Sequence, residues 1–390
     1  MKRYLIIGNG VAGTTAADYL RRHDKKNEIT ILTDEDLPFY YRIRLNDFIS
    51  GEIKKEGLIA KKPEWYAERR IKLLTGARVT GADPEKQWVV TAGNEKIPYD
   101  LLLIATGSKS FVPPIQGVAR EGVFTLRSVA DAEQISSFAD RCDHALLIGG
   151  GILGLETGKA LRKKGKKVMV VEFFPRLMPR QLDVRGAGRL QNRLEDMGFS
   201  FRLGVTVREI TGRHGVESVV LNNDEVIAAD MVIISAGVRP DLELAKQLGL
   251  ACGHGITVDD ALRTSRPEIF AAGDVAEFAG TLYGIWPAAM EQGRIAGINM
   301  AGTHEKYHGS VMANKLKVVG IDLASAGEID AENRFPAQMR ETDTVYRKIV
   351  LDDNRIIGCI LLGDTSDFAA ITRAIDEKTG ITAMKDTLKI

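Results

Sequence analysis

Two short glycine-rich stretches carry the clearest chemical signal in the sequence: "IIGNGVAG" at residues 6–13 and "IGGGILGLE" at residues 148–156. Each contains the spacing G-x-G-x-x-G. In this pattern the first glycine permits a tight turn, the second lets a pyrophosphate approach the backbone, and the third lets a helix pack closely on a strand. A helix that begins at such a turn presents free N–H groups and its positive dipole end to phosphates. Each stretch therefore predicts a dinucleotide-binding site.

The elements around the first stretch follow the order that such a site needs. The apolar run "RYLII" precedes the glycines, the helical pattern "TTAADYLRR" follows them, and a second apolar run, "EITIL", ends just before Asp34 and Glu35. An acid about 20 residues beyond the glycines can accept a hydrogen bond from a ribose hydroxyl. We therefore expect one of these two carboxylates to contact the ribose.

The second stretch repeats this order. The run "HALLI" leads to Gly149, Gly151 and Gly154, and then come the helical "LETGKALRKKG", the apolar "KVMVV" and Glu172. One G-x-G-x-x-G alone is a weak signal, because short glycine patterns recur by chance. Two copies, each with its strands, helix and acid in order, are a strong signal for two dinucleotide sites in one chain.

The repetition extends beyond the glycines. "DLLLIATG" (residues 100–107) is similar to "DMVIISAG" (residues 230–237), and each follows two apolar runs joined by a polar turn, which is typical of a hairpin. Each copy thus predicts a Rossmann half, a hairpin insertion and a returning buried strand. The segment "RPEIFAAGDVAEF" and the helix that begins near Pro287 indicate a return to the first domain.

The predicted fold is α/β, with two Rossmann-like (three-layer ββα) dinucleotide-binding domains and a small α+β C-terminal domain. In that C-terminal domain we expect two strands around the turn Asp352–Asn354, and then a helix in "DFAAITRAID". The predicted division is a discontinuous FAD-binding domain (1–112 and 238–308), an NAD(H)-binding domain (113–237) and the C-terminal domain (309–390).

Two adjacent dinucleotide sites suggest two cofactors that exchange electrons. Glu172 favours NADH at the second site, because a carboxylate would repel the extra phosphate of NADPH; Arg176 and Arg180 lie downstream and could weaken that preference. A flavin at the first site would accept a hydride and release single electrons.

The chain resembles the pyridine-nucleotide-dependent FAD oxidoreductases, the superfamily that includes the disulfide reductases. The resemblance rests on the two glycine turns, "ATG" at 105–107 and "AAGD" at 271–274, and it covers nearly the whole chain. The stretches "YYRIRLND" (40–47), "RQLD" (180–183), "KLKVVGID" (315–322) and "LLGDTSD" (361–367) are similar to NADH:rubredoxin oxidoreductases. They are equally similar to the flavin-containing N-terminal half of assimilatory NAD(P)H nitrite reductases.

The resemblance implies two sets of cofactor contacts and one residue beside the nicotinamide, Glu156. The implied FAD contacts are Gly8, Asn9, Gly10, Val11, Ala12, Gly13, Asp34 or Glu35, Arg42, Val79, Ala105, Thr106, Gly107, Arg127, Asp274 on the ribityl chain, Trp286 near the flavin, and Lys317 over its ring. The implied NADH contacts are Gly149, Gly151, Gly154, Glu172 and Gly237. The helix begun by Pro287 would point its N-terminus at the pyrimidine side of the flavin and stabilise negative charge there.

Ordinary structural roles remain open for several of these residues. Glu156 lies in the first turn of a predicted helix, where any acid is electrostatically favoured. Arg42 and Arg44 are interpretable as solvated surface charges, and Trp286 as a core residue.

The absence of one residue type narrows the chemistry. Disulfide reductases carry a C-x-x-x-x-C pair in the first flavin-domain helix, and related peroxidases and coenzyme A disulfide reductases carry one Cys near residues 40–47, yet residues 1–141 contain no Cys. The lysine that ferredoxin reductases usually show near Asn46 and Asp47 is absent too. Electrons must therefore pass from the flavin directly to an external acceptor, and the resemblance moves toward the rubredoxin and nitrite-reductase types.

Composition excludes several other classes. The 53 Lys and Arg against 52 Asp and Glu leave a net charge of +1, so nothing suggests nucleic acid or an anionic membrane as a partner. The N-terminal apolar run is too short for a signal peptide, and we expect a cytoplasmic protein. Cys142, Cys252 and Cys359 lack metal-ligand spacing, so we expect no metal site and interpret each as a small buried hydrophobe.

The leading hypothesis is an FAD-dependent NAD(P)H oxidoreductase that passes electrons from NADH via FAD to a small redox protein such as rubredoxin. The alternatives are a flavin subunit of a nitrite reductase system, an NADH oxidase that uses O₂, and a non-turnover flavoprotein that senses NADH. The sequence does not decide the acceptor, and it leaves a homodimer open.

Overall fold

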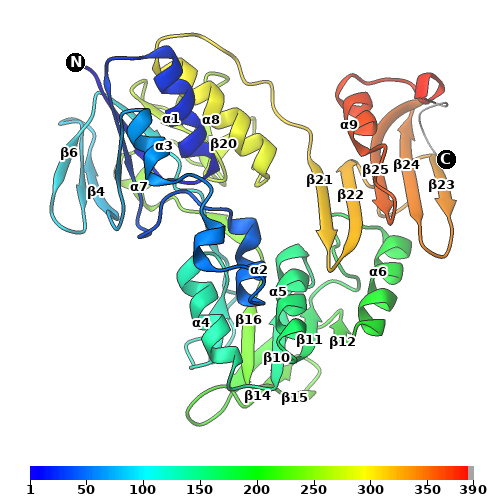
Figure 1. Ribbon diagram of the computed structural model, residues 1–390. Coiled ribbons are helices and arrows are strands. Elements are labelled where there is room, and N and C mark those ends of the chain that lie inside the picture. Colours follow the sequence, from blue (N-terminus) through cyan, green and yellow to red (C-terminus); the bar gives the residue numbers. More distant parts are fainter. Residues whose placement is uncertain (385–390) are drawn as a thin grey trace. The chain divides into compact units, whose positions relative to one another are not determined.

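The computed structural model describes residues 1–384, which form two compact units (Figure 1). The first unit comprises Met1–Arg44, Ile53–Lys109 and Val238–Ser310. The second comprises Leu45–Glu52, Ser110–Gly237 and the described residues from Val311 on. The chain therefore leaves the first unit and later returns to it. The division into three domains with the predicted boundaries stays a prediction.

The first unit is built on a parallel sheet whose apolar strands are buried on both faces, as continuous Ile/Leu runs require. Its strand order is β19 (Ile269–Ala271), β7 (Leu101–Ile104), β1 (Arg3–Ile7), β2 (Glu28–Leu32) and β3 (Ile71–Leu74). Helices α1 (Val11–His23) and α8 (Trp286–Met300) pack against each other at close range. A Cβ on Gly293 or Gly297 would lie 2.4 Å from the carbonyl oxygen of Ala12 or Ala16, so this contact needs glycine.

Smaller elements complete the first unit. The expected hairpin is a three-stranded antiparallel sheet of β4 (Val79–Asp83), β5 (Trp88–Thr91) and β6 (Lys96–Pro98). The chain leaves and re-enters the unit along the paired strands β8 (Ser108–Ser110) and β17 (Val238–Pro240). The other elements are the helices η1 (Arg42–Arg44), η2 (Lys55–Leu58), α3 (Pro63–Glu68) and α7 (Glu243–Gln247), and the strands β18 (Ile256–Val258) and β20 (Ala276–Phe278).

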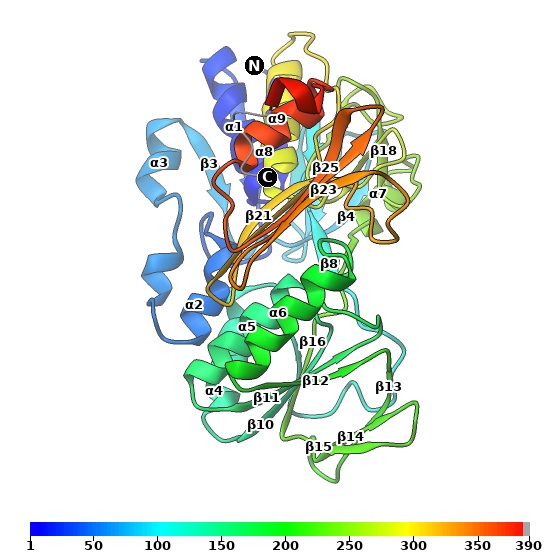
Figure 2. The ribbon, with the colours of Figure 1, turned by 90° about the vertical axis from the view of Figure 1, so that its right-hand side faces the viewer.

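The second unit contains a sheet of the same type. Its parallel strands are β12 (Phe199–Leu203), β11 (Lys167–Glu172), β10 (His144–Ile148), β16 (Met231–Ile234) and β9 (Val123–Thr125). The helices are α2 (Leu45–Ile49), α4 (Val129–Ala139), α5 (Ile152–Lys163) and α6 (Val184–Asp196), and the antiparallel strands are β13 (Val207–Thr211), β14 (Ser218–Leu221) and β15 (Val226–Ala228). Figure 2 shows α4, α5 and α6 on one side of the parallel sheet and the β13–β15 sheet on the other.

The two parallel sheets share a contact made by the aspartate that begins each of the two similar stretches. Asp100, which precedes β7, accepts the backbone N–H of Arg3 at 2.6 Å, at the start of β1. Asp230, which precedes β16, accepts the backbone N–H of His144 at 2.8 Å, at the start of β10. In both copies, the aspartate before the returning strand thus binds the start of the neighbouring strand.

The C-terminal part of the second unit is an antiparallel sheet covered by one helix. The strand order is β21 (Ala313–Val318), β22 (Ile321–Gly327), β25 (Arg355–Leu362), β24 (Tyr346–Asp352) and β23 (Ala337–Glu341), and α9 (Phe368–Asp376) and η3 (Ile381–Met384) follow. Asp353 and Asn354 adopt positive φ in the tight β24–β25 turn, as their residue types allow. The predicted fold class is confirmed.

Two findings concern the smaller expectations. Cys142 and Cys359 are buried as expected, but Cys252 is exposed, because it lies in the short loop before β18 and not in a packed strand. Among residues 1–384, no helix combines the length and the apolar character needed to cross a bilayer.

Candidate functional site

The first glycine turn joins β1 to α1 and has the geometry that its spacing predicts. Gly8 has φ +110°, and a Cβ there would lie 2.1 Å from the carbonyl oxygen of Ala105. A Cβ on Gly13 would lie 2.0 Å from the oxygen of Gly8. Beside Gly10, by contrast, a Cβ would meet no protein atom within 4 Å, which leaves open space in front of the helix N-terminus. Two glycines serve packing, and the middle one faces a space that a pyrophosphate could fill.

The second glycine turn, between β10 and α5, repeats this geometry. Gly149 has φ +117°, with a Cβ position 2.3 Å from the oxygen of Ser235, and the Cβ position of Gly154 lies 2.2 Å from the oxygen of Gly149. Gly151 again faces open space. Sequence reasoning thus located both turns and the packing roles of their outer glycines, whereas pyrophosphate binding at Gly10 and Gly151 stays a prediction.

The acids that follow the two turns do not occupy the same position. Gly149 donates its N–H to the oxygen of Val171, so Glu172 is the first residue beyond that contact; in the first copy Gly8 donates to Leu32, and the next residue is Thr33. Glu172 is only 7% exposed, and its carboxylate accepts the N–H of Gly150 at 2.6 Å. The structural counterpart of Glu172 in the first copy is therefore a hydroxyl residue, which the sequence analysis missed.

A groove lies in front of the first turn, and Glu35 lines it. The Glu35 carboxylate accepts a hydrogen bond from the Tyr40 hydroxyl at 2.5 Å and forms an ion pair with Arg42. Burial opposes the charge of Arg42, but Tyr40 and Glu35 outweigh it, and the pKa of Arg42 is raised. The groove is lined by Asn9, Gly10, Thr33, Glu35, Leu37, Pro38, Phe39, Tyr40 and Arg42.

Two polar side chains, one lining the groove and one near Gly8 in the first turn, fit a bound dinucleotide. The side-chain Nδ2 of Asn9 and Oγ1 of Thr106 are buried and have no hydrogen-bond partner among the described residues. A buried donor without a partner costs free energy unless a ligand or water satisfies it. Together with the open space at Gly10, these groups match the hydrogen-bonding edge of a cofactor such as FAD.

Asp274 lies beyond β19, on a turn that the sequence singled out. Its Oδ2 accepts the hydroxyl of Ser108 at 2.8 Å. The preceding Gly273 has φ +86° and donates its N–H to the side-chain oxygen of Gln292 at 2.8 Å, while the Nε2 of Gln292 is buried without a partner among the described residues. Gln292 is a second polar group that sequence reasoning missed, because a lone glutamine inside an apolar helix gives no pattern.

Trp286 is the first residue of α8 and lies in an aromatic cluster. Its ring stacks on Tyr41 at a centroid distance of 5.9 Å and contacts Phe39 at 6.0 Å. Phe39 also lines the groove in front of the first turn. Trp286 is partly exposed, so the interpretation as an ordinary core residue is not supported.

Glu156 lies in the first turn of α5 and is partly buried. Burial raises the pKa of this carboxyl, and Asp47 on α2 adds to the rise, whereas the N–H of Val319 lowers it by donating to Oε1 at 2.5 Å. Lys159 and Lys163 on the same helix also act to lower it. Glu156 thus lies beside the second glycine turn, in surroundings that raise its pKa above the ordinary value.

The remaining predicted residues occupy varied places. In the first unit, Asp34 is exposed, Val79 begins β4, Val11 and Ala12 form the first turn of α1, and Gly107 follows β7. In the second unit, Gly237 follows β16, Arg127 directly precedes the cap of α4, and Lys317 is an exposed residue of β21. The cofactor contacts assigned to all these residues stay predictions.

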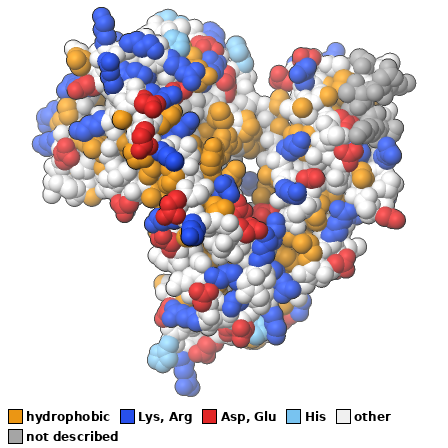
Figure 3. All heavy atoms as spheres, in the orientation of Figure 1, with side chains coloured by type: hydrophobic (Ala, Val, Ile, Leu, Met, Phe, Trp, Pro, Cys, Tyr) orange, Lys and Arg blue, Asp and Glu red, His pale blue; other side chains and the backbone are white. Residues whose placement is uncertain are grey.

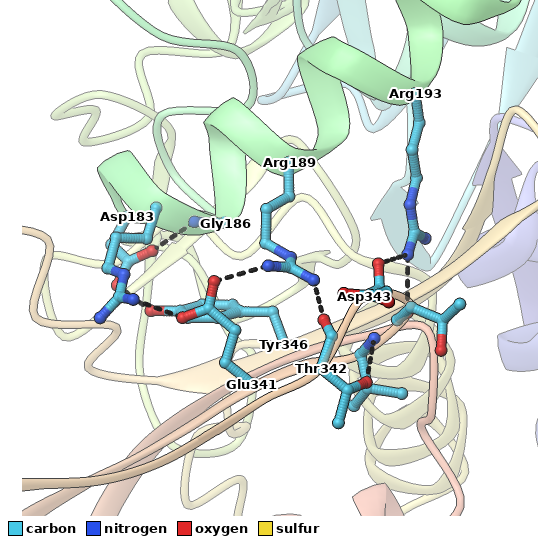
Figure 4. A network of polar contacts seen from close by, with 11 residues as sticks. Asp183, Gly186, Arg189, Arg193, Glu341, Thr342, Asp343 and Tyr346 are labelled. Carbon is cyan, nitrogen blue, oxygen red and sulfur yellow. Dashed lines mark hydrogen bonds and ion pairs between the residues drawn. The ribbon is translucent and has the colours of Figure 1, made fainter.

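The motif "RQLD" ends in a buried network that the sequence analysis did not explain. Asp183 caps α6 by accepting the N–H of Gly186 at 2.9 Å, and its other oxygen accepts the hydroxyl of Tyr346 on β24 at 2.6 Å (Figure 4). Arg189, further along α6, donates to Glu341 on β23 at 2.5 Å. Asp183 at the end of the motif therefore joins α6 to the C-terminal sheet of the second unit.

Comparison with known proteins agrees with these features. The sequence profile of the family described as Pyridine nucleotide-disulphide oxidoreductase matches residues 2–293, and the profile described as Rubredoxin NAD+ reductase C-terminal domain matches residues 313–379. The resemblance inferred from the motifs is confirmed.

The individual relatives include both nitrite reductases and rubredoxin oxidoreductases. The chain is 35% identical to the NAD(P)H nitrite reductase of Bacillus subtilis over 384 residues, which is 97% of this chain but 48% of that protein. It therefore spans about half the length of this relative. It is 32% identical to the NADH-rubredoxin oxidoreductase of Clostridium acetobutylicum, over 96% of this chain and 94% of that protein. The solved structure of a NADH:rubredoxin oxidoreductase from the same organism superimposes with a TM-score of 0.83 at 30% identity, covering 99% of this chain and all of that one.

Proposed function

This chain belongs to the pyridine nucleotide-disulphide oxidoreductase family, and on that premise we propose that it is an FAD-dependent NADH oxidoreductase that supplies electrons to a small redox protein such as rubredoxin. The observation that carries the proposal is the pair of glycine turns, which share one geometry and are followed by different ribose-side groups. Two such turns in one chain fit one held cofactor and one exchanging cofactor.

The first unit would hold FAD. The N-terminus of α1 and the open space at Gly10 would bind the pyrophosphate, and Glu35, positioned by Tyr40 and Arg42, would accept a ribose hydroxyl. Asp274 would bind the ribityl chain from its turn after β19. Bound there, a flavin supplies the ability to take a hydride from a nicotinamide and to give up electrons one at a time.

The second unit would bind NADH in preference to NADPH. Glu172 is buried, and both carboxylate oxygens accept backbone N–H groups, from Gly150 at 2.6 Å and from Phe174 at 2.8 Å, so its position is fixed. A fixed carboxylate at this position would bind a free ribose hydroxyl and repel a phosphate. Arg176 donates to the carbonyls of Leu182 and Pro179, which turns its guanidinium toward its own loop.

The distribution of thiols supports an external acceptor. Cys142 and Cys359 are buried, and burial raises the pKa of both thiols, that of Cys359 to about 12. A thiol that stays protonated is a poor nucleophile and cannot relay electrons by disulfide exchange. Residues 1–141 contain no cysteine, and Cys252, the one cysteine in the predicted FAD-binding domain, is not among the predicted FAD contacts; partial burial raises the pKa of its thiol too. The electrons would therefore leave the flavin for a second molecule.

A second candidate, the flavin-containing part of a nitrite reductase system, is favoured by one observation. The similarity to the nitrite reductase covers 97% of this chain but only 48% of that protein, so the same architecture serves there beside further protein. In that case the acceptor would be a partner that carries the nitrite-reducing centre, and the discontinuous FAD-binding domain, the NAD(H)-binding domain and the C-terminal domain would keep the roles proposed above.

The proposal is tested first by adding one equivalent of NADH anaerobically to the purified protein while following the flavin absorbance. Rapid bleaching with NADH and slow bleaching with NADPH are expected, and rubredoxin added afterwards should restore the absorbance faster than air does. A flavin that stays oxidised would contradict an NADH reductase. Restoration by air alone would favour the oxidase alternative, and no restoration by any acceptor would favour the sensor.

A further inference from the structure

The turn between β21 and β22 lies in the stretch "KLKVVGID" (315–322), and its two loop residues have no role in the proposed function. The flanking strand residues pair with each other, so the loop consists of Val319 and Gly320 alone, with φ +53° and +88°. A two-residue hairpin loop of this kind needs positive φ at both positions, which glycine adopts freely and a β-branched residue rarely does. The β24–β25 turn of the same sheet uses Asp353 and Asn354 instead. The valine therefore needs an explanation beyond the turn itself.

Glu156 on α5 accepts a hydrogen bond from this turn. Its Oε1 receives the backbone N–H of Val319 at 2.5 Å, and Val319 is only 2% exposed. A buried backbone N–H needs an acceptor, and a hydrogen bond to a carboxylate is stronger than one to a neutral oxygen. Unfavourable backbone conformations persist where the surrounding structure holds them, and they are frequent at functional sites. The conformation that is unfavourable for valine thus directs its N–H at one particular carboxylate.

A second stretch from the sequence analysis reaches the same part of α5. "YYRIRLND" (40–47) ends in α2, where the side-chain oxygen of Asn46 lies 3.0 Å from the hydroxyl of Thr157, the residue after Glu156. Thr157 is fully buried, and its hydroxyl also lies 2.7 Å from the carbonyl oxygen of Leu153. Both α2 and the β21–β22 turn belong to the second unit. Two stretches that are far apart in the sequence therefore hold residues 156–157, just beyond the second glycine turn.

Charges of both signs surround Glu156, and Figure 3 shows acidic and basic side chains mixed over the face that α4 and α5 form. Burial raises the pKa of the Glu156 carboxyl, and Asp47 on α2 raises it further. The N–H of Val319 lowers it, as do Lys159 and Lys163 on α5. The two turn residues carry no charge, so apart from burial they act on this carboxyl through the N–H.

The turn holds one of the two oxygens of Glu156. In the described part of the chain no residue donates a hydrogen bond to the other oxygen, Oε2. Glu156 lies two residues beyond Gly154, in the unit that is proposed to bind NADH. A carboxylate with one fixed oxygen can accept an N–H of a ligand at the other in a defined direction, and the carboxamide of a nicotinamide offers such an N–H.

We propose that the β21–β22 turn, through the backbone N–H of Val319, positions the Glu156 carboxylate to accept the carboxamide N–H of NADH. The inference rests on the proposed function and deepens it, because it makes the C-terminal sheet a part of the reaction with NADH. Val319 is a positioning residue, since it acts on the nicotinamide only through Glu156. The ionised carboxyl is the better acceptor, so the N–H of the turn also keeps the accepting form present at lower pH.

The test compares two tight turns of one sheet in the full-length FAD-loaded protein. Val319→Pro removes the N–H and cannot adopt φ +53°, and Gly320→Ala is a milder variant that keeps the N–H but disfavours the turn. Asp353→Pro and Asn354→Ala are the matched controls, because they make equivalent changes in the exposed β24–β25 turn. Val319→Asn is the conservative variant, because asparagine keeps the N–H and tolerates positive φ.

The first measurement is the rate at which NADH bleaches the flavin as a function of pH. In the unmodified protein this rate should rise with pH as Glu156 ionises. In Val319→Pro the rise should move to higher pH by about one unit, so that bleaching below it is roughly tenfold slower, because loss of the N–H raises the pKa of the carboxyl. Gly320→Ala should shift the rise in the same direction by less, and Val319→Asn and both controls should leave it in place. In the Glu156→Gln background, Val319→Pro should cause no shift, because no carboxyl remains to titrate.

The second measurement is the binding of ADP-ribose, which lacks the nicotinamide. All variants should bind it as tightly as the unmodified protein. Weaker ADP-ribose binding by Val319→Pro would mean that the substitution damages the whole nucleotide site, and a specific effect on Glu156 would be overturned.

The outcomes separate the positioning role from the function itself. A bleaching rate without a rise in the unmodified protein, or a rise that stays in place in Val319→Pro and Gly320→Ala, would overturn the positioning role and leave the proposed function standing. An equal shift in the β24–β25 controls would overturn it too. If a proline variant fails to fold, the comparison of Gly320→Ala with Asn354→Ala decides. A flavin that NADH does not bleach in the unmodified protein would contradict the proposed function, and the positioning role with it.

Discussion

Removing the carboxylate of Asp183 should loosen the contact between α6 and the C-terminal sheet. Asp183 is 3% exposed and serves two elements at once: it caps α6 through Gly186 and accepts the Tyr346 hydroxyl. Its Oδ2 also lies 3.5 Å from the Nζ of the fully buried Lys348. In Asp183→Ala the cap, the hydroxyl acceptor and one neighbour of the ammonium are lost together.

The expected loss of free energy follows from these three contacts. Loss of a helix cap costs about 1 kcal/mol, and leaving the Tyr346 hydroxyl buried without an acceptor costs about 1–3 kcal/mol. Lys348 still donates to the backbone oxygen of Asp330 at 2.6 Å and to the side chain of Asn333 at 2.9 Å. The free energy lost at Lys348 is therefore smaller than the cost of a buried charge without any partner. We therefore expect a loss of about 3 kcal/mol in the free energy of opening this contact, which corresponds to roughly a hundredfold in the opening equilibrium.

The assay must report on the second unit alone. Trp65, Trp88 and Trp286 all belong to the first unit, so intrinsic fluorescence would not register this loss. Hydrogen exchange followed by mass spectrometry on peptides from α6 and β24 measures the opening directly, and exchange there should accelerate roughly a hundredfold.

A matched control exists in the same unit. Ser128 caps α4 by accepting the N–H of Asp131 at 3.1 Å, so Ser128→Ala should accelerate exchange only near α4, by roughly fivefold. In a double-mutant cycle, Asp183→Ala and Tyr346→Phe should show a coupling energy of about 1–2 kcal/mol. Exchange in β24 that changes less than about fivefold in Asp183→Ala would refute the reasoning, because the carboxylate would then not hold the two elements together.

Three further predictions concern the cofactor sites. Gly10→Ala should leave unfolding unchanged but abolish FAD binding, whereas Gly8→Ala should prevent stable folding because its Cβ would lie 2.1 Å from the oxygen of Ala105; unfolding and flavin content of both variants check this, and normal FAD binding by Gly10→Ala would contradict it. Glu172→Ala should lower the kcat/KM ratio of NADH over NADPH by roughly tenfold or more, and an unchanged ratio would place the selectivity elsewhere. Folding raises the pKa of Glu156 above its ordinary 4.5, so the stability that this carboxyl contributes is present below pH 4.5 and lost as the pH rises through the folded pKa. Glu156→Gln should therefore raise the melting temperature at neutral pH, flatten the pH dependence of the melting temperature in the range just above pH 4.5, and slow flavin bleaching; a neutral-pH melting temperature that does not rise would refute this.

Much of the fold could be predicted because its signals are local. The glycine spacing is a steric requirement of each turn, and short apolar runs before and after it are typical of strands in a parallel sheet covered by helices. Asp100 and Asp230, which occupy equivalent places in the two similar stretches, make equivalent contacts, because each carboxylate accepts a backbone N–H at the start of the first strand of its sheet. Such local patterns predict structure because each one reflects a steric or burial requirement of its own segment.

Other features could not be predicted because they depend on register or on distant contacts. Counting residues from the glycines pointed to Asp34 or Glu35, but the end of β2 places Thr33 where the second copy has Glu172. The contact between Asp183 and Tyr346 joins residues 163 positions apart, and no local pattern in either segment predicts it. The exposure of Cys252 likewise depends on where a short loop ends and not on the apolar character of the residue.

The difference between the two copies explains how one turn can serve two purposes. The turns themselves have equivalent geometry, so in the proposed function both would bind phosphate and neither would distinguish one dinucleotide from another. Discrimination must come from the groups beyond the second strand. In the second unit that group would be the fixed carboxylate of Glu172, which is followed by Phe173, a side chain that is 65% exposed. In the first unit Glu35 is held by Tyr40 and Arg42 along a lined groove, which suits a cofactor that stays bound while its partner exchanges.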